Sequence, residues 1–248
     1  MGEGENLMRA SPINKSAKIG GNRRLKNHLP VPANVKLMLT FAEEKACISQ
    51  GYTRIAGIDE VGRGCIAGPL IAAAVIMPIN KKPRWFYGVN DSKRLSAKQR
   101  EAVFTHIQQA ALGIGIGTVS SQEIDAGGMT AANRKAMTMA VNQIFPLPDF
   151  LLIEFFKLPD LCLPQKSIID GDSCCFCIAC ASIVAKVCRD RLMKDLDSKY
   201  PGYGLAENKG YGTREHIASL HKLGPSPIHR RLFEPVQNVL QRGISGLP

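Results

Sequence analysis

Ile55-Ala56-Gly57-Ile58-Asp59-Glu60-Val61-Gly62-Arg63-Gly64 joins an apolar run to two adjacent carboxylates and a glycine-flanked arginine, and the pattern continues to Pro69. Carboxylates at the end of a buried strand can bind a hard divalent cation. Glycines let a large partner approach the backbone, and arginine prefers phosphate groups. The stretch therefore predicts a metal site beside a nucleic-acid backbone.

An isolated Asp-Glu pair is more often the solvated end of a strand. Here, however, acids also end two further apolar segments, as Glu154 and as Asp170-Gly171-Asp172. A two-metal hydrolase needs several carboxylates that meet at one place. Oxygen ligands of this kind favour Mg²⁺ or Mn²⁺ over metals that prefer thiols. The recurrence favours the metal site over the solvated turn.

Composition limits the class of protein. The 248 residues, 45% of them hydrophobic, are enough for one large domain, or for one domain with a small appendage. The formal net charge of +11 favours an anionic partner such as nucleic acid. No apolar run approaches the roughly 18 residues of a membrane span, so no membrane partner is expected. Eight cysteines without a secretion signal predict reduced thiols and a cytoplasmic location.

Three parts are expected along the chain. Residues 1–34 are polar and carry six basic and two acidic side chains, which favours a flexible basic arm with nonspecific phosphate contacts or, equally, a leader without function. Residues 35–198 alternate strand and helix patterns and predict an α/β catalytic domain. Residues 199–248 predict a helical C-terminal segment.

Local patterns predict the individual elements within these parts. Strands are expected at 54–58, 69–77, 113–120, 150–153 and 166–169. Helices are expected at 35–50, 97–111, 130–144, 174–198, 213–223 and 235–241. The glycine-apolar alternation at 113–120 indicates a strand that another element approaches closely.

A Cys-x-x-Cys pair at Cys177 and Cys180 could indicate zinc or redox chemistry. The segment has a continuous helical pattern, and no second pair lies at ligand spacing. We therefore favour small buried helical residues, since free cysteine packs as a small hydrophobe.

The predicted 174–198 helix places Ser182, Lys186 and Arg189 at i, i+4 and i+7, along one face. A hydroxyl and two cations in a row suit a phosphate backbone, although an ordinary solvated face has the same pattern. The loop at 208–213 contains Lys209 and Tyr211, which is typical of a nucleotide-stacking element. The tyrosine could instead anchor the loop.

Three histidines, His216, His221 and His229, are spaced too widely in the sequence to predict a metal set. We expect them to be structural or to face phosphate.

Taken together, these segments resemble the ribonuclease HII family, the type 2 ribonucleases H, from about Leu37 to Val239. The matching segments are 56–74, 91–96, 171–173, 178–190, 200–204, 208–213 and 224–235.

The resemblance implies a ribonuclease H-like fold, a mixed five-stranded sheet flanked by helices, with the helical C-terminal segment closing over the substrate. It implies a metal-dependent endonuclease that uses Mn²⁺ or Mg²⁺ to hydrolyse the RNA strand of RNA/DNA hybrids. Single ribonucleotides embedded in duplex DNA would also be cut, giving 3′-hydroxyl and 5′-phosphate ends. A monomer is the default expectation.

Site residues follow from the same resemblance. The four acids that would bind metal and catalyse are Asp59, Glu60, Glu154 and Asp172. Substrate contacts would come from Gly62, Arg63 and Gly64 at the ribose 2′-hydroxyl, from Tyr211 at the neighbouring deoxyribose, and from Lys93, Ser182 and Lys186 at phosphates.

The chain departs from the family pattern at a few positions. Glu154-Phe155 stands where Asp-Gly is usual, Asp170 where Lys is usual, and Leu232 where Ser is common. One added methylene displaces a carboxylate, and an offset of about 1 Å can reduce a rate on the order of 10²-fold. A catalytically weakened protein that binds RNA/DNA hybrids is therefore the alternative function.

Asp170 could compensate for this departure. We hypothesise that it lies in extended backbone, points the same way as Asp172, and either partly replaces the missing aspartate or adds an unusual negative charge near the metals.

Overall fold

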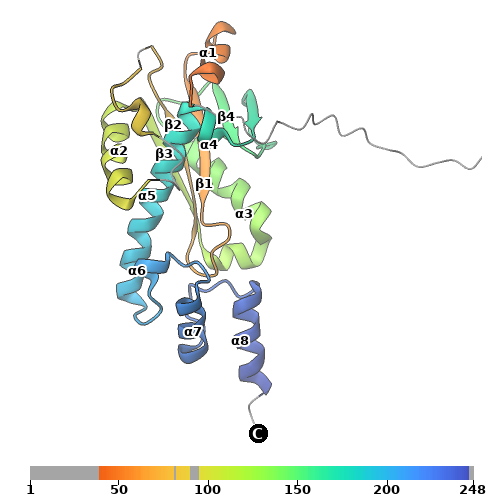
Figure 1. Ribbon diagram of the computed structural model, residues 1–248. Coiled ribbons are helices and arrows are strands. Elements are labelled where there is room, and N and C mark those ends of the chain that lie inside the picture. The colour runs from red at the N-terminus through yellow and green to blue at the C-terminus, as the bar shows by residue number, and fades with distance from the viewer. Residues whose placement is uncertain (1–38, 81, 90–94, 246–248) are drawn as a thin grey trace, which may run out of the picture. The chain divides into compact units, whose positions relative to one another are not determined.

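The centre of the fold is a five-stranded mixed sheet with the strand order β3-β2-β1-β4-β5 (Figure 1). The strands are β1 (Ile55–Val61), β2 (Leu70–Ile76), β3 (Gly113–Val119), β4 (Phe150–Glu154) and β5 (Gln165–Ile168). β2 pairs antiparallel with β1 and with β3, whereas β4 pairs parallel with β1 and with β5. The predicted sheet and its flanking helices are confirmed.

The computed structural model describes residues 39–80, 82–89 and 95–245. The predicted basic arm at 1–34 and the predicted phosphate ligand Lys93 lie outside the described residues. Residues 37–248 form one compact unit. The division at residue 198 stays a prediction.

Two long helices cover the two faces of the sheet (Figure 1). Successive residues of β2 point to opposite faces, so Ala73 and Val75 pack in the core cluster that contains α5 (Phe176–Lys199). Ala72 and Ala74 pack in the cluster that contains α3 (Ser121–Gln143). Both faces of the sheet are therefore buried.

Close backbone contacts explain the glycines of the sheet. A Cβ atom at Gly57 would collide with the backbone of Cys177 in α5. Gly115 and Gly117 lie directly against backbone carbonyls of α3. The predicted close approach to the 113–120 strand is confirmed.

Several helix boundaries differ from the prediction. Among the described residues, the helix expected at 35–50 begins only at Ala42, and the helix expected at 235–241 runs from Glu234 to Ser245. α3 begins at Ser121 rather than at 130, because Ser120 and Glu123 form a capping box; the helix is kinked at Gly128 (φ 77°). The helix expected at 174–198 is α5, which begins at Phe176 because Cys175 has extended backbone (φ −109°, ψ 123°), and a separate short helix, α4 (Gly171–Cys174), precedes it. This break gives Asp172 a helical turn of its own.

The remaining helices are shorter. They are α1 (Ala42–Ser49), the 3₁₀ helix η1 (Phe86–Gly88), α2 (Ala97–Ala110), α6 (Leu205–Asn208), α7 (Arg214–Leu223) and α8 (Glu234–Ser245). α6 lies between the helices expected at 174–198 and 213–223, where no helix was predicted. None of the helices within the described residues is long and apolar enough to cross a bilayer.

The C-terminal part is hydrogen-bonded to the glycine-rich loop at 62–69, which follows β1. Ala67 forms a β-bridge with His229, and the Ile66 amide donates to the Gly210 carbonyl at 2.9 Å. The Arg230 amide donates to the Ile66 carbonyl at 2.8 Å. The chain after α5 therefore fixes the glycine-rich loop from the side opposite the sheet.

All eight cysteines are free thiols. Cys177 and Cys180 are fully buried in α5, and burial raises the pKa of both thiols. Their interpretation as small packing residues is confirmed.

Candidate active site

The acids of the site come from the ends of neighbouring strands. β1 and β4 run parallel with Ile58 opposite Ile153, so Asp59 and Glu154 follow these residues at adjacent strand ends. Asp172 lies in α4, which begins shortly after the end of β5. The sheet order thus brings together residues more than 100 positions apart in the sequence.

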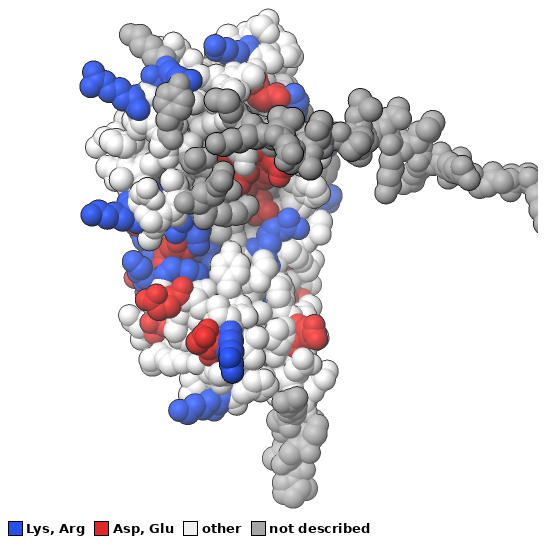
Figure 2. Space-filling model, viewed as in Figure 1, with Lys and Arg blue, Asp and Glu red and all other residues white. Residues whose placement is uncertain are grey.

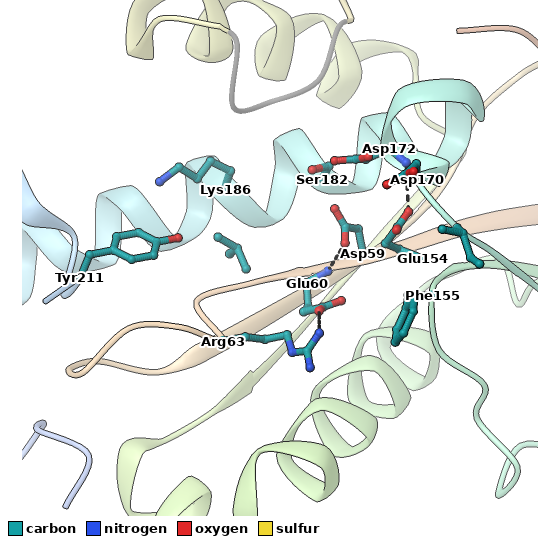
Figure 3. Close-up of a pocket in the computed structure, with 12 residues that line it drawn as sticks. Asp59, Glu60, Arg63, Glu154, Phe155, Asp170, Asp172, Ser182, Lys186 and Tyr211 are labelled. Carbon is teal, nitrogen blue, oxygen red and sulfur yellow. Dashed lines mark hydrogen bonds and ion pairs between the residues drawn. The ribbon is translucent and has the colours of Figure 1, made fainter. Parts of the chain in front are cut away.

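These side chains line one pocket of about 460 Å³ (Figure 3). The lining residues are Asp59, Glu60, Val61, Arg63, Glu154, Phe155, Ile169, Asp170, Asp172, Ser182, Lys186 and Tyr211. All four acids predicted to bind metal are therefore in one place. On the face drawn in Figure 2, Asp and Glu side chains gather near the middle, with Lys and Arg side chains around them.

Asp59 is the most buried of the four acids, with 6% of its surface exposed. Burial raises its pKa well above the ordinary value, and the charges of Glu60 and Glu154 raise it further. The Ser182 hydroxyl and the Glu60 amide, the latter at 2.7 Å, donate hydrogen bonds that oppose this shift. The site thus concentrates negative charge where solvent is scarce.

Glu154 has a similar environment. Burial raises its pKa to about 7, with a smaller contribution from the charge of Asp172. Its Oε2 accepts a hydrogen bond of 3.1 Å from the Asp172 amide, which partly offsets this effect. The longer side chain therefore reaches across to the start of α4.

The donor set fits a hard divalent cation, because it consists of carboxylate oxygens whose mutual repulsion a cation would relieve. Within the described residues, no three acid, histidine or cysteine side chains already stand close enough to coordinate one ion. Glu60 pairs with Arg63 at 3.6 Å, and Glu154 with the Asp172 amide. Binding an ion would therefore require these carboxylates to rotate toward each other.

The glycine-rich loop at 62–69 has two positions that demand glycine, Gly62 and Gly68, both with positive φ and no room for a Cβ atom. Gly62 has φ +99°, and a Cβ atom there would collide with the guanidinium of Arg189. Gly64 is exposed, with open space around its Cα. Between them, Arg63 is exposed, and its guanidinium lies over the Phe156 ring, 4.9 Å from the centroid. The loop thus directs one arginine into the pocket.

The structure corrects the prediction for Arg189. Its side chain is fully buried, and it donates to the carbonyls of Pro69, Ala67 and Lys209 at 3.0, 3.2 and 2.7 Å. The loops at 62–69 and around Lys209 cover this end of the α5 face, so Arg189 cannot face a phosphate. It holds the two loops together instead.

A second buried arginine completes this support. Arg230 donates to the Gly68 carbonyl at 3.0 Å and to the Arg63 carbonyl at 2.9 Å. Both buried arginines bind backbone of the glycine-rich loop. Sequence reasoning missed the role of Arg230, because nothing in its neighbours indicates burial.

The other predicted contacts divide into two groups. Ser182, Lys186 and Tyr211 line the acidic pocket, with Lys186 paired to Asp190 at 2.7 Å. Lys209 lies outside it: its ammonium donates to the Ala206 carbonyl, and it lines a separate pocket beside α2. The prediction that Lys209 belongs with Tyr211 in one substrate site is therefore not supported by the geometry.

Four lining residues were not among the predicted site residues: Val61, Phe155, Ile169 and Asp170. Asp170 was expected in extended backbone, but it is left-handed (φ 54°, ψ 33°) where the chain turns into α4. That expectation was wrong, yet its side chain still lines the pocket. The only sequence signal for these residues was the departure from the family pattern at 155 and 170.

Two of the three histidines meet in the interior. His216 Nε2 is 3.1 Å from His229 Nε2, and His216 Nδ1 is 2.9 Å from the Tyr211 carbonyl oxygen. His221 is exposed. The structural interpretation therefore holds for His216 and His229, which support the backbone at Tyr211.

Known proteins share both the sequence and the fold. A sequence model of the Ribonuclease HII family matches residues 56–236. A ribonuclease HII of Dehalococcoides mccartyi is 53% identical over 210 residues, which cover 85% of this chain and 99% of that protein.

Solved structures agree on the fold. Ribonuclease H2 from Pyrococcus horikoshii has a TM-score of 0.66 at 24% identity, over 77% of this chain and 98% of that one. Bst-RNase HIII in complex with Mn²⁺ has a TM-score of 0.57 at 18% identity, over 76% of this chain and 70% of that one. The chain therefore belongs to the ribonuclease HII family, whose members are metal-dependent endoribonucleases.

Proposed function

We propose that this chain hydrolyses the RNA strand of RNA/DNA hybrids and also nicks duplex DNA at single embedded ribonucleotides, leaving 3′-hydroxyl and 5′-phosphate ends. One observation carries the proposal: Asp59, Glu60, Glu154 and Asp172 line the same pocket as Arg63. Acids alone would suit many hydrolases. The adjacent arginine and glycine-rich loop add a contact for a ribonucleotide.

The four acids would hold Mg²⁺ or Mn²⁺. When bound, a pair of such ions supplies an activated water and stabilises the leaving oxygen of an in-line displacement at phosphorus. The Ser182 hydroxyl keeps the Asp59 carboxylate oriented toward the pocket, because it donates to that carboxylate from α5. Burial and the neighbouring carboxylates raise the pKa values of Asp59 and Glu154. A bound cation would relieve this repulsion between the carboxylates.

Recognition of RNA would come from the glycine-rich loop. A 2′-hydroxyl is both donor and acceptor, so exposed backbone at Gly64 and the Arg63 guanidinium can distinguish ribose from deoxyribose. The buried side chains of Arg230 and Arg189 donate hydrogen bonds to carbonyls of this loop and so fix its backbone. The loop is thus preorganised, which favours discrimination at a single sugar.

The remaining contacts would come from the pocket wall. Lys186 would contact a phosphate, and Tyr211 would pack against the sugar on the deoxyribose side. We propose further that residues 199–248 close over the duplex, that the arm at 1–34 adds nonspecific phosphate contacts, and that the protein acts as a cytoplasmic monomer.

A second function has one observation in its favour. Glu154 reaches past the β4 end to the Asp172 amide, so a displaced carboxylate could leave a protein that binds hybrids but cleaves them poorly. Incubation of a duplex containing one ribonucleotide with Mg²⁺ or Mn²⁺ separates the two functions. A nick at the ribonucleotide supports the nuclease, and binding without a nick supports the alternative.

A further inference from the structure

Phe155 has an unusual environment for a large apolar side chain. It is 60% exposed and lines the acidic pocket, although Leu151 and Ile153, just before it in β4, are fully buried. Its backbone is left-handed, with φ 57°. This conformation costs free energy for a bulky residue, and residues held in this way gather at functional sites.

Neighbouring contacts hold the ring in place. The Phe155 amide donates to the Ile168 carbonyl at 2.8 Å, which fixes the backbone to the end of β5. The ring packs edge-on against Phe156, with centroids 5.4 Å apart at 74°. Phe156 in turn lies beneath the guanidinium of Arg63. A continuous row of contacts therefore runs from Arg63 to Phe155.

The pocket also has an aromatic ring at its other end. Figure 3 shows Tyr211 and Phe155 on opposite sides of the acids, and Tyr211 is half-exposed. Ile169, 62% exposed, also lines the pocket. The apolar side chains of Phe155 and Ile169 cannot serve as ligands of a cation held by the neighbouring acids. An aromatic and apolar surface does suit packing against the base or sugar of a nucleotide.

We propose that Phe155 is a nucleotide-binding residue, whose ring packs against the base or the sugar of a nucleotide next to the one that Arg63 contacts. This inference rests on the proposed function, since it requires a duplex in the pocket. Aromatic rings stack on nucleotides of any sequence, because every base has a π-face. Phe155 would therefore strengthen binding without adding sequence preference.

The test is the variant Phe155→Gly, because glycine accepts φ 57° without strain. We expect the Kd for a duplex with one ribonucleotide, measured with Ca²⁺ under conditions where no nick forms, to rise roughly tenfold. The unfolding temperature should not fall, and the stabilisation by Mn²⁺ in thermal unfolding should stay unchanged. A binding loss with intact folding and intact metal binding separates a nucleotide contact from damage to Glu154.

Phe145→Ala is the matched control, because Phe145 is 84% exposed but does not line the acidic pocket. It should leave the Kd unchanged. Duplexes with one abasic site on either side of the ribonucleotide then identify the contact. If the effect of Phe155→Gly disappears on one of them, the ring packs on that base; if it persists on both, the ring packs on a sugar.

An unchanged or lower Kd for Phe155→Gly overturns the inference, as does a loss of Mn²⁺ stabilisation in that variant. These results differ from failure of the proposed function, in which the unaltered protein itself would neither bind nor nick the duplex.

Discussion

His216 and His229 share a single proton between Nε2 atoms that lie 3.1 Å apart in the interior. The Tyr211 carbonyl, 2.9 Å from His216 Nδ1, can only accept, so that nitrogen must carry a proton. His216 Nε2 therefore accepts from His229, whose Nδ1 accepts from the Ser226 amide at 3.0 Å. This chain of bonds requires both rings to be neutral.

Stability should therefore depend on pH through His229. Burial, with a smaller contribution from the neighbouring His216, lowers the pKa of His229 to about 4, so as pH falls the unfolded chain binds the proton first. The stabilisation is complete above about pH 6.5 and is lost as pH falls toward 4. Between pH 7 and pH 5 the free energy of unfolding should drop by about 2 kcal/mol from this residue.

Urea unfolding at both pH values measures this drop. His229→Asn is the reference, because its side-chain carbonyl can still accept from Ser226 but does not titrate. Carboxylates respond to pH in both proteins, and their contribution cancels in the comparison. An equal pH dependence in the two proteins would show that His229 does not control it.

Gly62→Ala should destabilise the fold by at least about 2 kcal/mol, because it adds a Cβ atom at φ +99° against Arg189. Gly64→Ala is the matched control and should change stability by no more than about 0.5 kcal/mol, since open space surrounds that position. Thermal and urea unfolding of both variants provide the measurement. Equal stability of the two would contradict the packing described for Gly62.

Much of the fold could be predicted because its signals are local. The apolar runs of β1 and β4 are short and end at acids, and the helix expected at 97–111 is α2, which Ser96 caps. The meeting of Asp59 with Glu154 depends on the parallel pairing of β1 with β4, which local pattern does not determine; the family resemblance implied only that the two acids share a role.

Contacts with segments that are distant in the sequence explain what could not be predicted. The i, i+7 spacing places Arg189 on the same face of α5 as Ser182, but it does not reveal that the loop at 62–69 covers that end of the helix. The break at Cys175 and the left-handed turn at Asp170 similarly depend on packing against the sheet. Lys209 was misplaced for the same reason, because a short helix, α6, turns its side chain away.

Arg189 and Lys186 should therefore respond differently to substitution. Arg189→Met should lower the free energy of unfolding by about 3 kcal/mol or more, because it removes the donor from the buried carbonyls of Pro69 and Ala67 and from the partly buried carbonyl of Lys209. Lys186→Met should leave stability within about 1 kcal/mol but weaken duplex binding and reduce its salt dependence by roughly one counterion. Binding isotherms at several salt concentrations, with urea unfolding, distinguish the two. A stable Arg189→Met protein with a reduced salt slope would restore the phosphate-binding role.

Glu154→Asp should raise the cleavage rate, or relax a preference for Mn²⁺ over Mg²⁺, because it withdraws the carboxylate by one methylene. The same change should cost about 1 kcal/mol of stability, since it removes the hydrogen bond from the Asp172 amide. Single-turnover rates with each metal and urea unfolding test both effects. A lower rate with both metals would mean that Glu154 is adapted to its position.

Cleavage of a duplex that contains one ribonucleotide, with Mg²⁺ or Mn²⁺, tests the central claim most directly. The all-DNA duplex of the same sequence and the variant Asp172→Asn serve as controls. We expect a single nick at the ribonucleotide with 3′-hydroxyl and 5′-phosphate ends, no nick in the all-DNA duplex, and at least about a 100-fold loss of rate in the variant. No nick by the unaltered protein with either metal, or equal cleavage of the all-DNA duplex, would contradict the account.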